Sequence, residues 1–175
     1  MTELEEFRKE KDLVFARHPQ SPLTDEQKKG FTGLTYYPEI PDLRLELELD
    51  EFQEQDRIEM QTSTGDIQVY TRHGRITFEA EGEQVSFTIY NSQHGFFLPF
   101  VDGGAGKETY GAGRYLEPEP LRNGKLLVDF NMAYNPYCAY NELYSCPLTP
   151  WENRTRVPIR AGEMLPQGEW AAHES

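Results

Sequence analysis

The sequence has few basic residues, only two cysteines and no long apolar segment, and each shortage excludes a class of protein. Lysine and arginine total 17 against 30 aspartate and glutamate residues, which gives a formal net charge of −13. A surface of that sign repels nucleic acid unless a local basic cluster overcomes it, and the sequence contains no such cluster. We therefore expect no nucleic-acid partner.

The sequence also lacks any apolar run near the roughly 20 residues that a membrane-spanning helix requires. The first ten residues are charged and acidic, without the apolar stretch of a signal peptide. We therefore expect a cytoplasmic protein with no membrane partner. Two cysteines are too few for the disulfide framework of a small secreted protein, and the sequence indicates no metal site and no particular cofactor.

What the sequence does contain, from Leu34 onward, is a repeated alternation of apolar and polar residues. Because side chains alternate between the two faces of a strand, this pattern is typical of strands with one buried face. Turn signals recur about every eight to ten residues, which is typical of an antiparallel meander. The strands that we expect cover residues 43–49, 58–62, 67–71, 76–80, 85–89, 126–130 and 157–160, with turns at 64–66, 73–74, 81–83 and 123–124.

Two helices are expected before the strands. Thr2 with Glu5 matches a capping box at the start of a helix that runs to about Arg17, and Thr24 and Gly30 are the expected ends of a second, short helix. These elements predict an all-β, mainly antiparallel fold, a barrel or sandwich with an N-terminal α-helix. The 175 residues fit one domain, with helices at about 2–30, a β-domain at about 34–163 and a C-terminal tail at 164–175.

A glycine-rich loop from Asp102 to Arg114 is the first candidate for chemistry. Its glycines can direct backbone N–H groups towards a ligand, and Lys107 and Arg114 add positive charge to an otherwise acidic protein. These features suit a carboxylate or phosphate group. The spacing fits neither a P-loop nor a dinucleotide-binding motif, so the alternative is a long connection between strands with glycines at its turns.

Asp129 is the second candidate, because it lies on an expected strand among apolar neighbours. A carboxylate in such surroundings needs a partner, and Arg114 is the natural one, with Lys107 second. Two interpretations remain open. Asp129 is either half of a structural ion pair or a general base that also orients a ligand.

The two cysteines, Cys138 and Cys146, are separated by seven residues, which matches no common zinc or redox motif. One hypothesis makes Cys138 a nucleophile paired with His94, with Asp129 or Asn135 as the orienting group. The alternatives are two small buried side chains or a disulfide formed on oxidation.

The stretch around Cys138 is rich in tyrosine and asparagine. Tyrosine offers an apolar wall with one polar tip, so Tyr110 and Tyr134 suit the lining of a small-molecule pocket. Asparagine side chains mimic turn backbone, so Asn131 and Asn135 equally suit a long segment that packs on itself as a lid. The sequence leaves both interpretations open.

Three strings, at 108–116 (ETYGAGRYL), 129–140 (DFNMAYNPYCAY) and 146–150 (CPLTP), resemble the signature of a bacterial and archaeal family catalogued as domain of unknown function 1684. The resemblance extends upstream to the residues around Ser21 and to 31–38, so it covers most of the chain. It implies a family but no reaction. Thr149 stands where members of this family commonly have proline.

The hypothesis that we prefer is a binding or catalytic pocket at one end of a β-barrel, with a small anionic ligand as the possible partner. Asp129 and Cys138 are its candidate catalytic residues. An alternative is a structural or interaction protein, monomeric or homodimeric, with a self-packed lid; a weaker alternative is a cysteine-dependent hydrolase. The candidate ligand-binding residues are Lys107, Tyr110, Arg114, Asn131, Tyr134 and Asn135.

Overall fold

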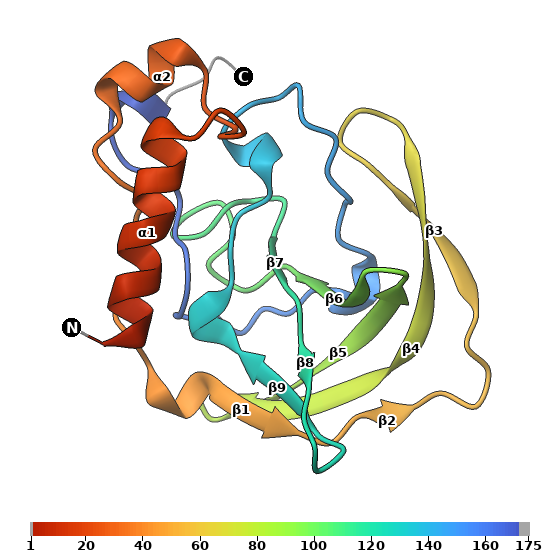
Figure 1. The fold of residues 1–175 in the computed structure, drawn as a ribbon. Helices are drawn as coiled ribbons and strands as arrows, with labels where there is room; N and C mark the ends of the chain where they lie inside the picture. The colour runs from red at the N-terminus through yellow and green to blue at the C-terminus, as the bar shows by residue number, and fades with distance from the viewer. Residues whose placement is uncertain (1, 172–175) are drawn as a thin grey trace.

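The computed structural model, which describes residues 2–171, contains two antiparallel sheets and an N-terminal helix (Figure 1). One sheet has the order β1-β9-β8, and the other has the order β2-β4-β5-β6-β7, with β3 also paired to β4. The described strands form no closed barrel. The strands are β1 Arg44–Leu47, β2 Asp50–Glu51, β3 Arg57–Gln61, β4 Ile67–Ala80, β5 Glu83–Ser92, β6 Gly95–Phe100, β7 Arg114–Leu116, β8 Glu119–Pro120 and β9 Leu126–Asp129.

The two helices are α1, Glu3–Arg17, and α2, Asp25–Gly30. The Thr2 hydroxyl accepts the backbone N–H of Glu5 in the first turn of α1, and Thr24 forms a full capping box on α2. Helix α1 runs along one side of the molecule, opposite the β3–β4 hairpin (Figure 1). None of the helices described is long and apolar enough to cross a membrane.

Strand β4 is longer than the alternation predicted, because residues 73–74 do not form a turn. The strand continues through them, with a shift in its register against β5 between Arg72 and Gly74. A Cβ atom on Gly74 would lie 2.7 Å from the backbone oxygen of Asp50 in β2. Glycine is therefore needed here for the close approach of a neighbouring strand.

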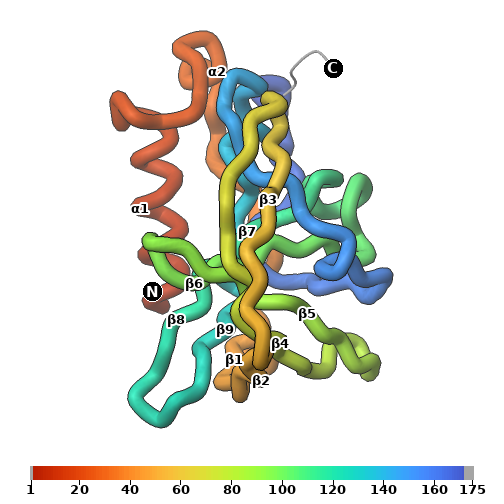
Figure 2. The backbone as a smooth tube through the Cα atoms, turned by 90° about the vertical axis from the view of Figure 1, so that its right-hand side faces the viewer, coloured from red at the N-terminus to blue at the C-terminus, as the bar shows by residue number. Residues whose placement is uncertain are grey.

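The other predicted turns in this region are confirmed. Glu81 and Gly82 both have positive φ, 52° and 75°, as a two-residue hairpin between twisted strands requires. Residues 123–124 turn the chain between β8 and β9, and this hairpin projects from the rest of the fold (Figure 2).

The strand expected at 157–160 is absent, and that prediction was wrong. Residues 157–160 have no regular secondary structure. Val157 accepts the backbone N–H of Gly103 at 3.0 Å, and the N–H and C=O of Ile159 bond to side chains instead of to a strand. The backbone polar groups are satisfied, as burial requires, but by partners that an alternating pattern does not reveal.

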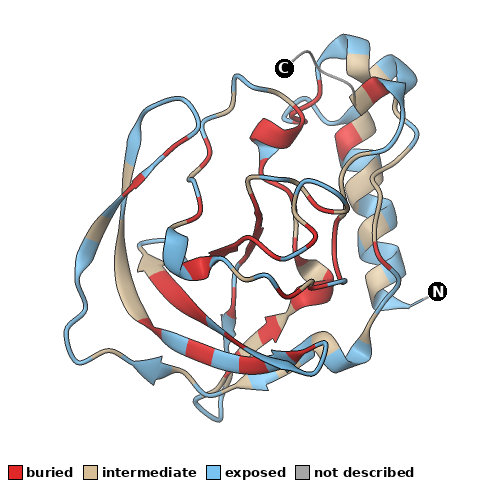
Figure 3. Cartoon of the chain, turned by 180° about the vertical axis from the view of Figure 1, so that it is seen from behind, coloured by how far each residue is buried: buried red, intermediate tan, exposed pale blue. Residues whose placement is uncertain are grey.

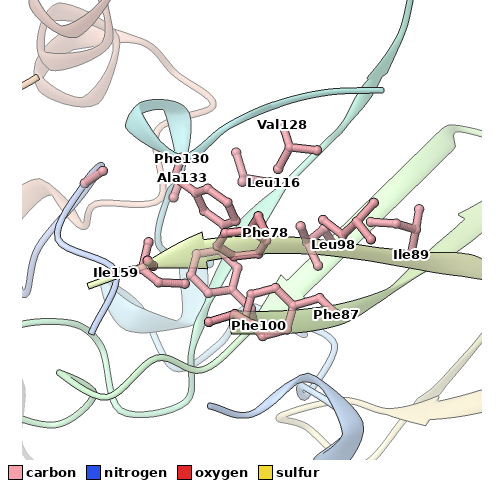
Figure 4. Close-up of a cluster of buried hydrophobic side chains, with 14 of the residues drawn as sticks. Phe78, Phe87, Ile89, Leu98, Phe100, Leu116, Val128, Phe130, Ala133 and Ile159 are labelled. Carbon is pink, nitrogen blue, oxygen red and sulfur yellow. The ribbon is translucent and has the colours of Figure 1, made fainter. Parts of the chain in front are cut away.

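The main hydrophobic core lies between the long β4–β5–β6 layer and the chain around β9 (Figure 4). Buried Ile76, Phe78 and Ala80 alternate along β4 with exposed residues, and Figure 3 shows this alternation. Phe130, which follows β9, packs with its ring centroid 4.9 Å from Phe78 and 5.3 Å from Phe100. Burial of each such side chain contributes about 1.5–3 kcal/mol.

Candidate functional site

Arg114, at the start of β7, is almost completely enclosed, with 1% of the residue exposed. Its guanidinium donates to three backbone carbonyls, those of Ile159 at 2.9 Å, Ala161, and Glu163 at 3.0 Å. Its acidic neighbour is Asp102, with the oxygen 3.6 Å from Nη2. Burial lowers the pKa of Arg114, and the charge of Asp102 acts in the opposite direction. Arg114 therefore holds the 159–163 segment in place of a strand partner.

Asp102 anchors the other end of this arrangement. Its carboxylate accepts hydrogen bonds from the Thr109 hydroxyl at 2.8 Å, from the Ile159 N–H at 2.9 Å and from the Gly104 N–H at 3.3 Å. The glycine-rich loop is thus folded around a buried acid, and Lys107 lies exposed on it. This geometry favours the interpretation of the loop as a connection over that of an anion cradle.

The predicted pairing of Asp129 with Arg114 was wrong. Asp129 instead accepts two hydrogen bonds from Asn131, from its backbone N–H at 3.0 Å and its side-chain nitrogen at 2.9 Å. Its basic neighbour is the exposed Arg44, at 3.9 Å. Asn131 bonds in turn to both the N–H and the C=O of Ile40, at 2.8 and 2.9 Å. Its amide group therefore acts as a peptide group would in a sheet.

A buried network around Glu163 was missed by the sequence analysis. Its Oε1 atom accepts the N–H of Asn135 and the hydroxyl of Tyr140, both at 3.0 Å, and its Oε2 atom pairs with the amine of Lys11. The Asn135 side chain donates to Tyr140 at 3.1 Å and to the Met164 carbonyl at 3.0 Å. The signal in the sequence was Lys11 itself, a cation among the spaced apolar residues of α1, because a cation that packs against the protein needs an acidic partner.

A cavity of about 880 Å³ lies between α1, the strands around β8 and β9, and residues 134–147; we call it the α1 cavity. Among the predicted residues, Tyr134 and Asp129 line it, whereas Lys107, Tyr110, Arg114, Asn131, Asn135 and Cys138 are not part of its wall. Its main apolar and aromatic lining is formed by Phe7, Met132, Tyr134, Tyr137, Tyr144 and Pro147.

Tyr134 occupies a central place in this lining. Its hydroxyl donates to a carboxylate oxygen of Glu117, and its ring centroid lies 5.1 Å from the Lys11 amine. Burial, together with the adjoining Glu117 carboxylate, raises the pKa of Tyr134. Acids outnumber bases in the wall. The charged lining residues are Glu3, Lys11, Arg44, Glu117, Glu119 and Asp129.

The two cysteines are neighbours beside this cavity, and both are free. The backbone N–H of Cys138 donates to the sulfur of Cys146 at 3.3 Å, and the Tyr110 hydroxyl lies 3.8 Å from the Cys138 sulfur. A hydrogen bond between the thiols lowers the pKa of Cys138 to about 6 and raises that of Cys146. His94, the expected catalytic partner, lies in the β5–β6 turn, where its ring is 3.4 Å from the Gln93 side chain.

Within residues 2–171 no group of three histidine, cysteine or acidic side chains is placed to hold a metal ion. The segment 129–147 makes contacts both within itself and with other parts of the chain. Tyr137 and Tyr144 meet edge to face, with their ring centroids 5.3 Å apart, and the Asn141 side chain donates to the Pro22 carbonyl at 3.1 Å. The segment therefore has an ordered internal structure and also forms one wall of the α1 cavity.

Comparison with known proteins places the chain in a family. The model described as Protein of unknown function (DUF1684) matches residues 29–164, so the chain belongs to this family. A solution NMR structure of the uncharacterized protein from gene locus rrnAC0354 of Haloarcula marismortui is 33% identical. The match covers 92% of this chain and 91% of that one, with a TM-score of 0.68. No curated protein matches the chain.

Proposed function

We propose that this member of the DUF1684 family binds a small molecule with an apolar body in the α1 cavity. The observation that carries the proposal is the cavity itself, about 880 Å³ with a wall of aliphatic and aromatic residues and a few polar groups. Small-molecule sites have this size and composition. The pocket lies between α1 and the two sheets, not at the end of a barrel.

The charge of the wall bears on the class of ligand. The sequence suggested an anion held by Arg114 and Lys107, but neither residue lines the cavity. Four carboxylates face two cations there, and one of those cations, Lys11, is already paired with Glu163. In a protein of net charge −13 this wall favours a neutral or positively charged ligand, and the Tyr134 and Tyr137 rings can stack against a cation.

The alternative of a self-packed lid is compatible with this proposal. The Tyr137–Tyr144 ring contact and the bonds of Asn135 to Tyr140 support an ordered segment, and an ordered wall costs less free energy to bind against than a mobile one. The lining residues that this segment contributes then hold a ligand by fitting its shape and take no part in a chemical reaction. We therefore propose binding and not catalysis.

The experiment uses dyes of three charges, uncharged Nile red, anionic 1-anilinonaphthalene-8-sulfonate and cationic thioflavin T, followed by fluorescence titration. Phe7→Ser removes an apolar side chain from the cavity wall, and Leu13→Ser is the matched control. Both residues lie on α1 with similar exposure, 44% and 47%, but Leu13 does not line the cavity.

We expect saturable binding of the neutral and cationic dyes, weakened about tenfold by Phe7→Ser and unchanged by Leu13→Ser. Equal effects of the two substitutions, or no saturable binding of any dye, would refute the proposal. Binding of the anionic dye alone would keep the site and restore the anionic ligand that the sequence suggested.

A further inference from the structure

The two cysteines form a second site that the cavity proposal does not use. They come from separate parts of a folded segment, Cys138 from the 3₁₀ turn Tyr137–Ala139 and Cys146 from the stretch that follows Tyr144. The two residues are in direct contact, because the backbone N–H of Cys138 donates to the Cys146 sulfur at 3.3 Å.

Each cysteine is held in place by its own contacts. Cys146 and Ser63 are bonded twice, since the Cys146 N–H donates to the Ser63 hydroxyl at 3.1 Å and the Ser63 N–H donates to the Cys146 carbonyl at 2.9 Å. The Tyr110 hydroxyl lies 3.8 Å from the Cys138 sulfur. Two small side chains that serve only as packing would not need donors aimed at their sulfurs.

Access to the pair comes from one side. Both residues are mostly buried, with 8% of Cys138 and 7% of Cys146 exposed, but Cys146 lines the α1 cavity. A small oxidant in that cavity therefore meets the pair at Cys146, whose sulfur is in contact with Cys138. This access favours an intramolecular reaction over crosslinking to another chain.

We propose that Cys138 and Cys146 are a redox-active dithiol that reduces a small peroxide and closes to an intramolecular disulfide. The Cys138 thiolate attacks one peroxide oxygen, the O–O bond breaks, and hydroxide leaves, which gives a sulfenic acid. The Cys146 sulfur then attacks the Cys138 sulfur, an S–S bond forms, and the Cys146 proton and the sulfenic hydroxyl leave as water. The hydroxide takes up the proton that the Cys138 thiol has lost, so with hydrogen peroxide two electrons pass from the thiols to the peroxide and two water molecules are formed in total.

The roles of the two sulfurs follow from their hydrogen bonds. The Tyr110 hydroxyl lies 3.8 Å from the Cys138 sulfur and can donate to it, and the pKa of Cys138 is lowered while that of Cys146 is raised, so the negative charge is placed on Cys138. Cys138 is thus the attacking sulfur and Cys146 the resolving one. Tyr110 is a positioning residue, because it acts through Cys138.

The test treats the fully reduced protein with hydrogen peroxide and titrates its thiols after denaturation. We expect two thiols to disappear per peroxide consumed, a linked peptide pair that contains Cys138 and Cys146, and recovery of both thiols with dithiothreitol. Cys146→Ser should accumulate a sulfenic acid that dimedone traps on Cys138. Cys138→Ser should react with peroxide at least about tenfold more slowly than the unaltered protein.

Several outcomes would overturn the inference. These are two free thiols after peroxide treatment, disulfides only between chains, or a Cys138→Ser variant that consumes peroxide as fast as the unaltered protein. Competitive labelling of the unaltered protein with limiting iodoacetamide needs no substitution and guards against misfolded variants. Faster labelling of Cys146 than of Cys138 would refute the assigned roles. None of these measurements depends on a ligand in the α1 cavity.

Discussion

Replacement of Asp102 by asparagine tests whether Arg114 is a structural cation held by this acid. The substitution removes one negative charge and almost no volume. An asparagine can still accept hydrogen bonds from the Gly104 and Ile159 N–H groups through its oxygen, and its nitrogen can face the Thr109 hydroxyl. The main change is therefore that the Arg114 charge loses its acidic neighbour.

The magnitude follows from burial. Arg114 is 1% exposed and its carboxylate neighbour is equally enclosed, so solvent cannot compensate the lost charge. Removal of one partner from a buried ion pair costs about 3–5 kcal/mol. Because Arg114 keeps three carbonyl acceptors, we expect the lower end, about 3 kcal/mol. Asp129→Asn is the matched control, since its neighbour Arg44 is exposed and 3.9 Å away, and we expect it to cost less than about 1 kcal/mol.

The assay is urea unfolding of both variants, followed by tryptophan fluorescence. With a slope of about 2 kcal/mol per molar urea, a loss of 3 kcal/mol moves the midpoint down by about 1.5 M at unchanged slope. If Asp129→Asn is destabilised as much as Asp102→Asn, or Asp102→Asn stays within about 0.5 M of the unaltered protein, the reasoning about the buried pair is wrong.

Three further predictions rest on other contacts. The hydrogen bond from Cys146 lowers the pKa of Cys138 to about 6, so the reactive thiolate of Cys138 persists down to that pH and is lost below it. The rate of iodoacetamide labelling at Cys138 should therefore have its midpoint near pH 6. A midpoint above pH 8 would contradict this prediction. Gly162→Ala should cost at least about 2 kcal/mol in urea unfolding, because φ is +83° and the new Cβ would lie 2.7 Å from a backbone oxygen, whereas Gly65→Ala, at φ +90° in open space, should cost about 1 kcal/mol. Asn153→Ala should lower the free energy of unfolding by about 2–4 kcal/mol, measured as a fall in the thermal midpoint, because this buried amide makes three hydrogen bonds of 2.7–2.8 Å to β5 and β6. An unchanged midpoint would show that these bonds are replaceable.

Much of the strand layout could be predicted from the sequence, because a strand with one buried face must alternate. Residues 76–80 and 85–89 show that pattern. The short turn expected between them is present as two residues with positive φ, which form a hairpin. The failure at Gly74 has a physical reason. In the sequence, a glycine that allows the close approach of a neighbouring strand cannot be distinguished from a glycine that makes a turn. Only the short distance from Gly74 to Asp50 in the structure shows which role it has.

The candidate site was harder to predict, because its partners are set by tertiary distance. The choice of Arg114 for Asp129 rested on charge alone, while the fold supplies a nearer acid, Asp102, at the other end of the same loop. Residues 157–160 were predicted as a strand because of their apolar residues, but the backbone N–H and C=O of Ile159 bond to the side chains of Asp102 and Arg114. In the sequence, Lys11 is a cation that interrupts the apolar residues of α1. Its pairing with Glu163, which only the structure shows, explains why it lies there.

The strings that carry the family resemblance are rich in asparagine, arginine and glycine for a reason that the hydrogen bonds make plain. Long stretches between β6 and residue 171 lack strand partners, so Arg114, Asn131 and Asn135 satisfy backbone groups that a sheet would otherwise pair. These residues are therefore committed to the fold. About half of the residues that line the α1 cavity lie outside those strings, among them Phe7 on α1. The search for a ligand should therefore begin with Phe7, which lines the cavity without taking part in the buried network, whereas Lys11 on the same helix pairs with Glu163.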